Sequence, residues 1–193
     1  MKSICVYCGS ANQASQEYFR AAHQMGETLA RRGLSLVYGG GKTGLMGALA
    51  GSVLDSGGEV IGVIVESMNT PELAHTRLTQ LEVMATIHQR KARMYELADG
   101  YIALPGGYGT LDELFETLTW AQIGEHCKPV GLLNVNGYYD SLLAMLDRAL
   151  EEKFLFPEHR RALLCDSQPE ELLDAMIAFQ PPLEAVKRWM RQE

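Results

Sequence analysis

A run of glycines followed at once by acidic residues is the part of this sequence best suited to chemistry. Residues 105–113 read Pro-Gly-Gly-Tyr-Gly-Thr-Leu-Asp-Glu and follow the apolar run 101–104. A strand, a glycine turn and a helix start in that order present backbone N–H groups that bind phosphate. A phosphate cradle gains nothing from negative charge, yet Asp112, Glu113 and Glu116 stand beside it. The combination indicates a phosphate held next to a group that becomes positive.

Two basic residues interrupt the apolar stripe of the helix predicted at 87–98. Arg90 and Lys91 share that stripe with Met94 and Leu97. A cation on an inward face costs on the order of several kcal/mol unless it is paired or solvated. Either both side chains extend from the edge of the stripe to solvent, or Arg90 binds a phosphate or carboxylate through its forked guanidinium. The sequence alone leaves both alternatives open.

The helix predicted at 111–123 carries the acidic side of this arrangement. The spacing of its apolar residues predicts a core face formed by Leu111, Leu114, Phe115 and Leu118. The opposite face then carries Glu113, Glu116, Thr117 and Trp120. A tryptophan on that face would expose a large apolar surface, which a ligand cleft or a second subunit would cover. We therefore expect a homodimer with this face near the interface.

Glu113 also has a purely structural explanation. Thr110 and Glu113 have the spacing of a capping box, in which the threonine caps the helix and the glutamate accepts a hydrogen bond from the threonine N–H. Capping and catalysis do not exclude each other, so the spacing leaves both roles open.

A second glycine cluster, Gly-Gly-Gly-Lys-Thr-Gly at 39–44, follows another predicted strand. It is not a P-loop, because that motif requires a glycine where Leu36 stands. The cluster matches Gly-x-Gly-x-x-Gly, and Glu66 lies near the position of a ribose-binding acid. However, it follows the second strand rather than the first, which disfavours a dinucleotide fingerprint. We interpret the cluster as a tight turn or, preferably, as a second loop facing the same ligand cleft.

The elements that must hold these residues alternate along the chain. Apolar strands are predicted at 3–7, 34–38, 60–65, 81–85, 101–104 and 130–134. Amphipathic helices are predicted at 16–32, 44–56, 87–98, 111–123, 138–152 and 169–179. This rhythm predicts an α/β fold, a Rossmann-like doubly wound parallel sheet with helices on both faces and ligands at the carboxyl ends of the strands. We expect one domain over 1–180 and a C-terminal tail over 181–193.

Composition limits the partners. With 193 residues and a net charge of -7, the chain is not expected to bind nucleic acids or anionic membranes in general, because both need a basic face, whereas a local basic pocket stays open. It shows neither a signal peptide nor an apolar run of about 20 residues, which predicts a cytoplasmic protein. Cys5 and Cys8 have redox spacing, but Cys5 lies inside a predicted strand, so all four cysteines are expected to be structural or incidental. No metal and no cofactor are expected.

Two of these motifs together resemble a known family. The run His-Gln-Arg-Lys-Ala-Arg-Met at 88–94 and the run at 105–113 closely resemble the Lonely Guy (LOG) family of cytokinin-activating nucleotide phosphoribohydrolases. The similarity covers about residues 3–156 and extends through 39–47, 119–122 and 128–135. Two motifs at matched spacing make the resemblance specific.

The resemblance implies a dimeric enzyme that hydrolyses the N-glycosidic bond of N6-substituted adenosine 5′-monophosphates, releasing the free base and ribose 5-phosphate. AMP itself is a further expected substrate. By position, Arg90 and Glu113 match the essential pair of the family. The implied substrate contacts are Glu72, Lys91, Gly106, Gly107, Tyr108, Gly109, Thr110 and Thr119.

This chemistry agrees with the residue types. Breaking a bond from ribose C1′ to a purine nitrogen develops oxocarbenium character on the sugar. Glu113 would stabilise that charge and orient the attacking water, while the glycine loop anchors the 5′-phosphate. Arg90 would either anchor the phosphate or assist the departing base, and the sequence does not separate these roles.

Two other function classes remain open. Glycine loops need only bind, so a non-catalytic nucleotide-binding or carrier module is the main alternative. A pyridoxal-phosphate decarboxylase would need a Schiff-base lysine, and Lys42 and Lys91 are the lysines near the expected cleft. Neither stands in a context that marks it as a desolvated amine.

Overall fold

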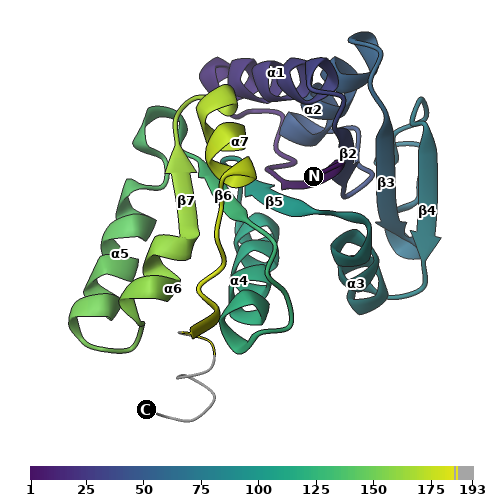
Figure 1. Ribbon diagram of the computed structural model, residues 1–193. Helices are drawn as coiled ribbons and strands as arrows, with labels where there is room; N and C mark the ends of the chain where they lie inside the picture. The colour runs from purple at the N-terminus through teal and green to yellow at the C-terminus, as the bar shows by residue number, and fades with distance from the viewer. Residues whose placement is uncertain (185, 187–193) are drawn as a thin grey trace.

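The computed structural model describes residues 1–184 and residue 186 (Figure 1). In this part of the chain, one sheet contains seven strands in the order β4-β3-β2-β1-β5-β6-β7. Their bounds are Ser3–Tyr7 (β1), Ser35–Tyr38 (β2), Val60–Val65 (β3), Gln80–Met84 (β4), Gly100–Ala103 (β5), Val130–Leu133 (β6) and Leu163–Asp166 (β7). Neighbouring strands all pair in parallel. The predicted doubly wound parallel fold is therefore confirmed.

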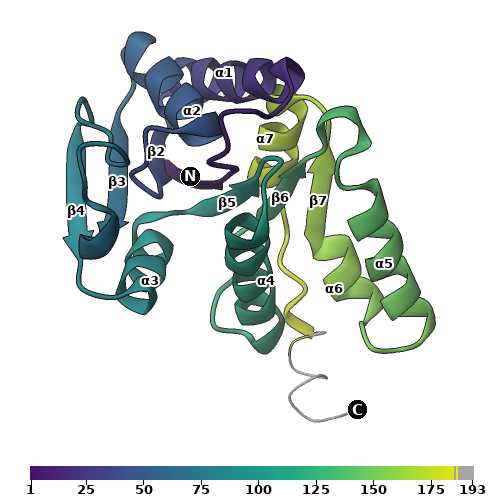
Figure 2. The ribbon, with the colours of Figure 1, turned by 180° about the vertical axis from the view of Figure 1, so that it is seen from behind.

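Helices cover both faces of the sheet (Figures 1 and 2). On one face lie α1 (Gln16–Arg31), α2 (Gly44–Asp55) and α7 (Pro169–Ile177). On the other face lie α3 (Ile87–Leu97), α4 (Tyr108–Ile123) and α5 (Asp140–Glu151), with α6 (Pro157–Ala162) beside α5. Two short 3-10 helices, η1 (Glu66–Met68) and η2 (Val135–Gly137), follow β3 and β6. The two helices that carry the predicted catalytic pair, α3 and α4, thus share one face.

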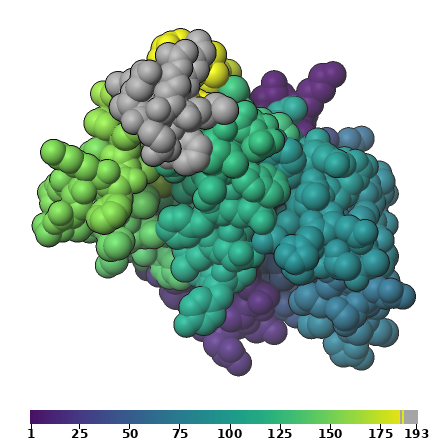
Figure 3. Space-filling view, turned by 90° about the horizontal axis from the view of Figure 1, so that it is seen from below, coloured from purple at the N-terminus to yellow at the C-terminus, as the bar shows by residue number. Residues whose placement is uncertain are grey.

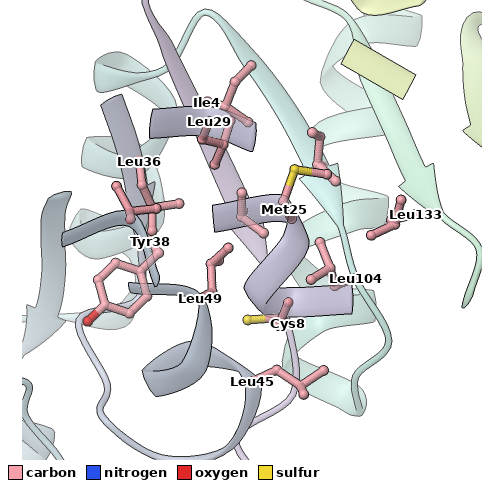
Figure 4. Close-up of a cluster of buried hydrophobic side chains, with 14 of the residues drawn as sticks. Ile4, Cys8, Met25, Leu29, Leu36, Tyr38, Leu45, Leu49, Leu104 and Leu133 are labelled. Atoms are coloured by element: carbon pink, nitrogen blue, oxygen red, sulfur yellow. The ribbon is translucent and has the colours of Figure 1, made fainter. Parts of the chain in front are cut away.

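Alternation of side chains along the strands produces two cores. Ile4 of β1 packs with Leu29 of α1 and Leu49 of α2 in the first core (Figure 4). Tyr7 of the same strand packs with Met94 of α3 in the second core, on the opposite face. Full burial of one such leucine stabilises the fold by about 1.5–3 kcal/mol. The two cores together hold the carboxyl ends of the strands in fixed positions. The site is built at these ends.

Cys5 and Cys8 lie on opposite sides of the sheet. Cys5 belongs to the second core and Cys8 to the first, as expected for residues three apart in extended chain. Both are buried and free, and burial raises the pKa of both thiols. These positions agree with the predicted structural role and disfavour a reactive thiolate pair.

The C-terminal third contains two elements that were not predicted. α6 and β7 follow each other over 157–166, and β7 pairs with β6 to form an edge of the sheet. Of the predicted tail at 181–193, residues 185 and 187–193 lie outside the described residues, so that boundary stays a prediction. No helix within the described residues has the length and apolar character needed to cross a membrane.

Candidate active site

The loops after β1 and β5 meet where the strand order reverses. The chain leaves β1 toward α1 on one face and β5 toward α4 on the other (Figure 1). The N–H of Gly9 donates to the carbonyl of Pro105 at 3.0 Å. A β-carbon on Gly106 would lie 2.1 Å from Oγ1 of Thr110 and 2.8 Å from the nitrogen of Gly9, so a side chain there would force the loops apart. Doubly wound sheets bind ligands at this switch point.

α4 begins at the switch point with donors available to a ligand. Its N-cap is Gly107, and no side chain caps the helix. The first N–H groups of a helix, here those of Tyr108 and Gly109, have no carbonyl in a preceding turn. Tyr108 is 94% exposed, so the helix start opens to solvent. Free donors and the positive end of the helix dipole make this an anion site.

The capping box that the spacing of Thr110 and Glu113 left open does not form. The extended backbone of Gly107 serves as the N-cap, so α4 starts at Tyr108 rather than at residue 111. Thr110 therefore lies inside the first turn, where it is 3% exposed. Because the helix starts earlier, Glu113 is not needed at the cap and turns to another partner.

That partner is Arg90 of α3. Nη1 of Arg90 lies 3.0 Å from Oε1 of Glu113, and each side chain is 13% exposed. Nε of Arg90 donates to the carbonyl of Val63, in β3, at 2.9 Å. The alternative in which Arg90 extends to solvent is therefore wrong. A guanidinium held by both a carbonyl and a carboxylate has a fixed direction as well as a charge.

The second glycine cluster borders this ion pair. A β-carbon on Gly39 would lie 2.1 Å from Nη2 of Arg90. The N–H of His75 donates to the carbonyl of Gly40 at 2.9 Å, which joins the loop before β4 to the cluster. The cluster thus stands beside the catalytic candidates, as the interpretation of a second loop at the same cleft requires.

Burial sets the protonation behaviour of Glu113. Removal from water raises the pKa of Glu113, and the charge and hydrogen bond of Arg90 oppose that rise without cancelling it. The neighbouring charge of Asp112 raises the pKa further. Glu113 is therefore a carboxylate whose charge depends on Arg90.

Lys91 completes the charged cluster. Its Nζ lies 3.1 Å from Oδ2 of Asp112 and 3.0 Å from Oε1 of Glu116. Burial lowers the pKa of Lys91, but its bonds with Glu116 and Asp112 raise it more, and the pKa ends above the ordinary value. Lys91 is thus held as a cation on the inward face of α3.

α4 buries most of the predicted core face: Leu114 is buried and Leu111 and Leu118 pack against the second core, so the prediction is wrong only for Phe115. The buried residues of the helix are Thr110, Leu114 and Thr117, whereas Phe115 is 39% exposed. The hydroxyl of Thr117 donates to the carbonyl of Glu113 at 2.8 Å, so its oxygen accepts from the hydroxyl of Tyr7 at 2.9 Å. The helix packs over the polar end of β1, so its inward face carries hydroxyl and carboxyl groups.

A residue of the same chain packs against the side chain of Trp120. Its ring meets the ring of Tyr95 of α3 edge to face, with the centroids 4.9 Å apart. Figure 3 shows the segments of α3 and α4 lying against each other on this face of the molecule. The exposed tryptophan that led us to expect a dimer is therefore accounted for without a second subunit.

Two predicted substrate contacts, both within the described residues, form no hydrogen bond or ion pair with Arg90 or Glu113. Glu72 is exposed in the loop before β4, and hydrogen bonds with its own backbone and with Thr70 lower its pKa. Thr119 is exposed, and its hydroxyl donates to the carbonyl of Phe115 at 2.7 Å. It lines an apolar cavity of about 140 Å³ on another side of α4, with Phe115 and Leu118. The structure brings together Arg90, Lys91, Glu113 and the glycine loop, whereas Glu72 lies in the loop bonded to the second glycine cluster and Thr119 lines the apolar cavity.

Sequence reasoning missed the two tyrosines that follow η2. The hydroxyl of Tyr138 donates to the carbonyl of Gly106 at 2.6 Å, and that of Tyr139 donates to the carbonyl of Leu104 at 2.6 Å. The available signal was an Asn-Gly-Tyr-Tyr turn after a strand. Nothing in that turn indicates a contact with a loop 32 residues earlier.

Comparison with known proteins identifies close relatives. The family model described as possible lysine decarboxylase matches residues 46–176. A probable cytokinin riboside 5′-monophosphate phosphoribohydrolase of Oryza sativa subsp. japonica is 45% identical over 192 residues, covering 100% of this chain and 77% of the relative. A cytokinin riboside 5′-monophosphate phosphoribohydrolase of Arabidopsis thaliana is 45% identical over 185 residues, covering 96% of this chain and 85% of the relative.

A solved structure shares the fold at lower sequence identity. The molybdenum cofactor binding protein from the phototrophic bacterium Rippkaea orientalis has a TM-score of 0.70 and 25% identity, over 92% of this chain and 97% of that one. Its identity is well below that of the plant relatives. The chain belongs to the family described as possible lysine decarboxylase and, within it, to the Lonely Guy cytokinin riboside 5′-monophosphate phosphoribohydrolases.

Proposed function

We propose that this protein hydrolyses the N-glycosidic bond of N6-substituted adenosine 5′-monophosphates, and of AMP, to free base and ribose 5-phosphate. The observation that carries the proposal is the buried pair of Arg90 and Glu113 beside the uncapped start of α4. An anion site and a shielded carboxylate on one helix match a substrate with a phosphate at one end and a developing cation at the other. The relatives named for this reaction support the same assignment.

The helix sets the spacing between the two functions. Glu113 follows Tyr108 by five residues, which is roughly 7.5 Å along the helix axis. We assign the N–H groups of Gly107, Tyr108 and Gly109 to the 5′-phosphate and the side chain of Glu113 to the ribose. Binding the remote phosphate then positions the sugar carbon before any bond breaks.

The reaction follows from that placement. As the C1′–N9 bond breaks, its electron pair leaves with the purine, and positive charge develops on C1′ and the ring oxygen. The carboxylate of Glu113 stabilises this charge in a site shielded from water. A water oxygen then bonds to C1′ and Glu113 accepts its proton; the purine takes up one proton from solvent to leave as the neutral base, and Glu113 returns its proton to solvent, which restores the carboxylate.

Arg90 acts on this carboxylate. Its Nε is occupied by the carbonyl of Val63 and its Nη1 by Glu113, while Nη2 lies over Gly39. We therefore assign Arg90 to holding Glu113 ionised and oriented, which differs from both roles that the sequence left open. An unpaired carboxylate at this depth would take up a proton and lose its function.

The decarboxylase alternative conflicts with the state of the lysines. A Schiff base needs a lysine that loses its proton easily. Lys91 is held between two carboxylates with a raised pKa, and the ammonium of Lys42 donates to the carbonyl of Pro71. The two carboxylates favour the charged amine of Lys91, and the amine of Lys42 is engaged by a backbone carbonyl, so neither lysine is prepared to attack a carbonyl.

The carrier alternative has one observation in its favour, the fold shared with a molybdenum cofactor binding protein. Product formation separates the two functions. The purified protein is incubated with AMP and with N6-isopentenyl-AMP, and free base is measured by chromatography. Base release from either nucleotide supports the hydrolase, whereas tight binding of both without release supports the carrier.

The matched variants are Glu113→Gln and Glu96→Gln. The amide introduced by Glu113→Gln still accepts a hydrogen bond from Arg90 but carries no charge, so hydrolysis should fall at least about 100-fold while nucleotide binding persists. Glu96 is 61% exposed and pairs with Arg93, so its variant should keep full turnover. Wild-type turnover in Glu113→Gln would refute the catalytic assignment.

We also infer that the protein forms a homodimer through the outer side of α4, α5 and the turn that follows α5. Phe115, Met145 and Phe154 are 39%, 65% and 83% exposed in the single chain. Phe115 also lines the apolar cavity beside α4. Large exposed apolar side chains near a cavity favour a protein contact. The cytoplasmic location inferred from the sequence stays a prediction.

A further inference from the structure

The glycine loop before α4 directs all its carbonyl groups to donors of the protein. The carbonyls run from Leu104 to Gly107. Their donors are, in order, the Tyr139 hydroxyl at 2.6 Å, the Gly9 N–H at 3.0 Å, the Tyr138 hydroxyl at 2.6 Å and the Leu111 N–H at 3.1 Å. A carbonyl oxygen facing the bound phosphate would repel it. The hydrogen bond to the Gly106 carbonyl, which is next to the helix start, therefore decides which polar group the loop presents to an anion there.

Of these four donors, Tyr138 controls the peptide group nearest the helix start. The carbonyl of Gly106 and the N–H of Gly107 belong to one planar trans peptide, so they point in opposite directions. When the Tyr138 hydroxyl holds the carbonyl, the N–H of Gly107 is turned to the other side. Nothing lies within 4 Å of a β-carbon built on Gly107, which leaves open space at this residue.

The turn after β6 brings the Tyr138 hydroxyl to the loop. Asn136 and Gly137 both adopt the left-handed region, with φ of 52° and 66°, and reverse the chain within η2. The ring of Tyr138 then meets Tyr18 of α1 edge to face, with the centroids 5.6 Å apart. Tyr139 forms a second edge contact with it at 5.0 Å. Two ring contacts limit the directions that the hydroxyl takes.

We propose that Tyr138 is a positioning residue for phosphate recognition: its hydroxyl holds the Gly106 carbonyl so that the Gly107 N–H faces the 5′-phosphate of the substrate. This inference rests on the proposed hydrolase function. It assigns to Tyr138 an effect on the phosphate end of the nucleotide and none on the bond that breaks. Without the hydroxyl, the peptide is free to rotate its carbonyl toward the anion.

The test removes one oxygen atom, that of the Tyr138 hydroxyl. Tyr138→Phe keeps the ring contacts and removes the donor. We expect KM for AMP to rise about three- to tenfold, the effect of one hydrogen bond, with kcat within about twofold of the wild type. In the Glu113→Gln background, which blocks turnover, the Kd for ribose 5-phosphate should rise by the same factor. The Kd for adenosine, which lacks the phosphate, should not change.

Tyr139→Phe is the matched control. Tyr139 also donates to a loop carbonyl, that of Leu104, but the next residue is Pro105, which has no N–H to orient. Tyr139 is 1% exposed, so its variant should lower the melting temperature. Its KM for AMP, measured well below that temperature, should equal that of the wild type.

The outcomes separate the two proposals. Absence of base release from the wild-type protein would refute the hydrolase, while the ribose 5-phosphate titration would still report on Tyr138. An unchanged Kd for ribose 5-phosphate when Tyr138→Phe is added to the Glu113→Gln background would overturn the positioning role. An equal loss of adenosine affinity would overturn it too, because the effect would then be a general disturbance of the cleft.

Discussion

Gly39 and Arg90 share one volume: the guanidinium occupies the space that a side chain at residue 39 would take. A β-carbon there would lie 2.1 Å from Nη2, far inside van der Waals contact. The glycine that follows β2 is therefore a condition for the ion pair between α3 and α4. The second glycine cluster contributes to the site by leaving room for a cation, and it needs no ligand of its own to do so.

Gly39→Ala should displace the guanidinium and disturb its contact with Glu113. A misplacement of about 1 Å in a catalytic group costs on the order of 100-fold in rate, so kcat should fall by about that factor. Gly51→Ala is the control, because nothing lies within 4 Å of a β-carbon at this position inside α2. That variant should keep its activity and gain about 0.5–1 kcal/mol of stability. Full activity in Gly39→Ala would contradict the role of the ion pair.

The pH dependence of kcat/KM should show an acid limb above the ordinary carboxyl range. Glu113 must be charged to act, and burial raises its pKa, so activity is lost as the pH falls through that raised value. Asp112→Asn removes a charge that raises the pKa of Glu113 and leaves Lys91 freer to lower it. The limb should therefore move to lower pH.

The control for this shift is Asp55→Asn. Asp55 is 69% exposed on α2 and pairs with Arg77, away from the ion pair. Its pH profile should coincide with that of the wild type. A shift of the limb to higher pH in Asp112→Asn would mean that Glu113 is not the group that titrates.

The Tyr7 and Thr117 hydroxyls should be coupled in stability. Thr117→Val removes the acceptor of the buried Tyr7 hydroxyl and should cost about 1–3 kcal/mol. Tyr7→Phe removes the donor and should cost about 1 kcal/mol. The double variant should lose less than the sum of the two, because it leaves no buried hydroxyl without a partner. Urea unfolding of all four proteins measures this, and strictly additive losses would show that the hydroxyls act independently.

Dimer formation should depend on the outer side of α5. Met145→Glu places a charge at a position that is 65% exposed in the single chain, so the fold should tolerate it while the dimer dissociates. Light scattering coupled to size exclusion measures the mass. Ile177→Glu, at a 61% exposed position on α7 across the sheet, should remain a dimer. A monomeric wild type would end this proposal.

Periodicity predicted the order of strands and helices because most of them bury continuous apolar runs. β7 escaped prediction because it has four residues, only one of them fully buried, and follows a helix with two arginines. Its strand conformation comes from pairing with β6, which is a tertiary effect.

The site was predictable to the extent that its chemistry is local. Arg90 stood out because a cation on an apolar stripe needs a partner, and the structure supplies Glu113. The start of α4 was placed three residues late because Thr110 has the local spacing of a cap, while the contact of Gly106 with Gly9 joins residues far apart in sequence. The hydrogen bond from Tyr138 to the Gly106 carbonyl also joins residues far apart in sequence, so no spacing rule predicts it.

The net charge of the five ionised side chains at and around Glu113 bears on how ionic strength affects substrate affinity. Arg90 and Lys91 contribute two positive charges, and Asp112, Glu113 and Glu116 contribute three negative ones, so these five side chains sum to -1. A phosphate dianion bound beside them meets no excess of cationic side chains, and its attraction comes from oriented peptide dipoles within hydrogen-bond range. Screening weakens interactions between distant exposed charges far more than such contacts. Substrate affinity in this enzyme should therefore be almost independent of ionic strength, unlike that of a site lined with lysine and arginine.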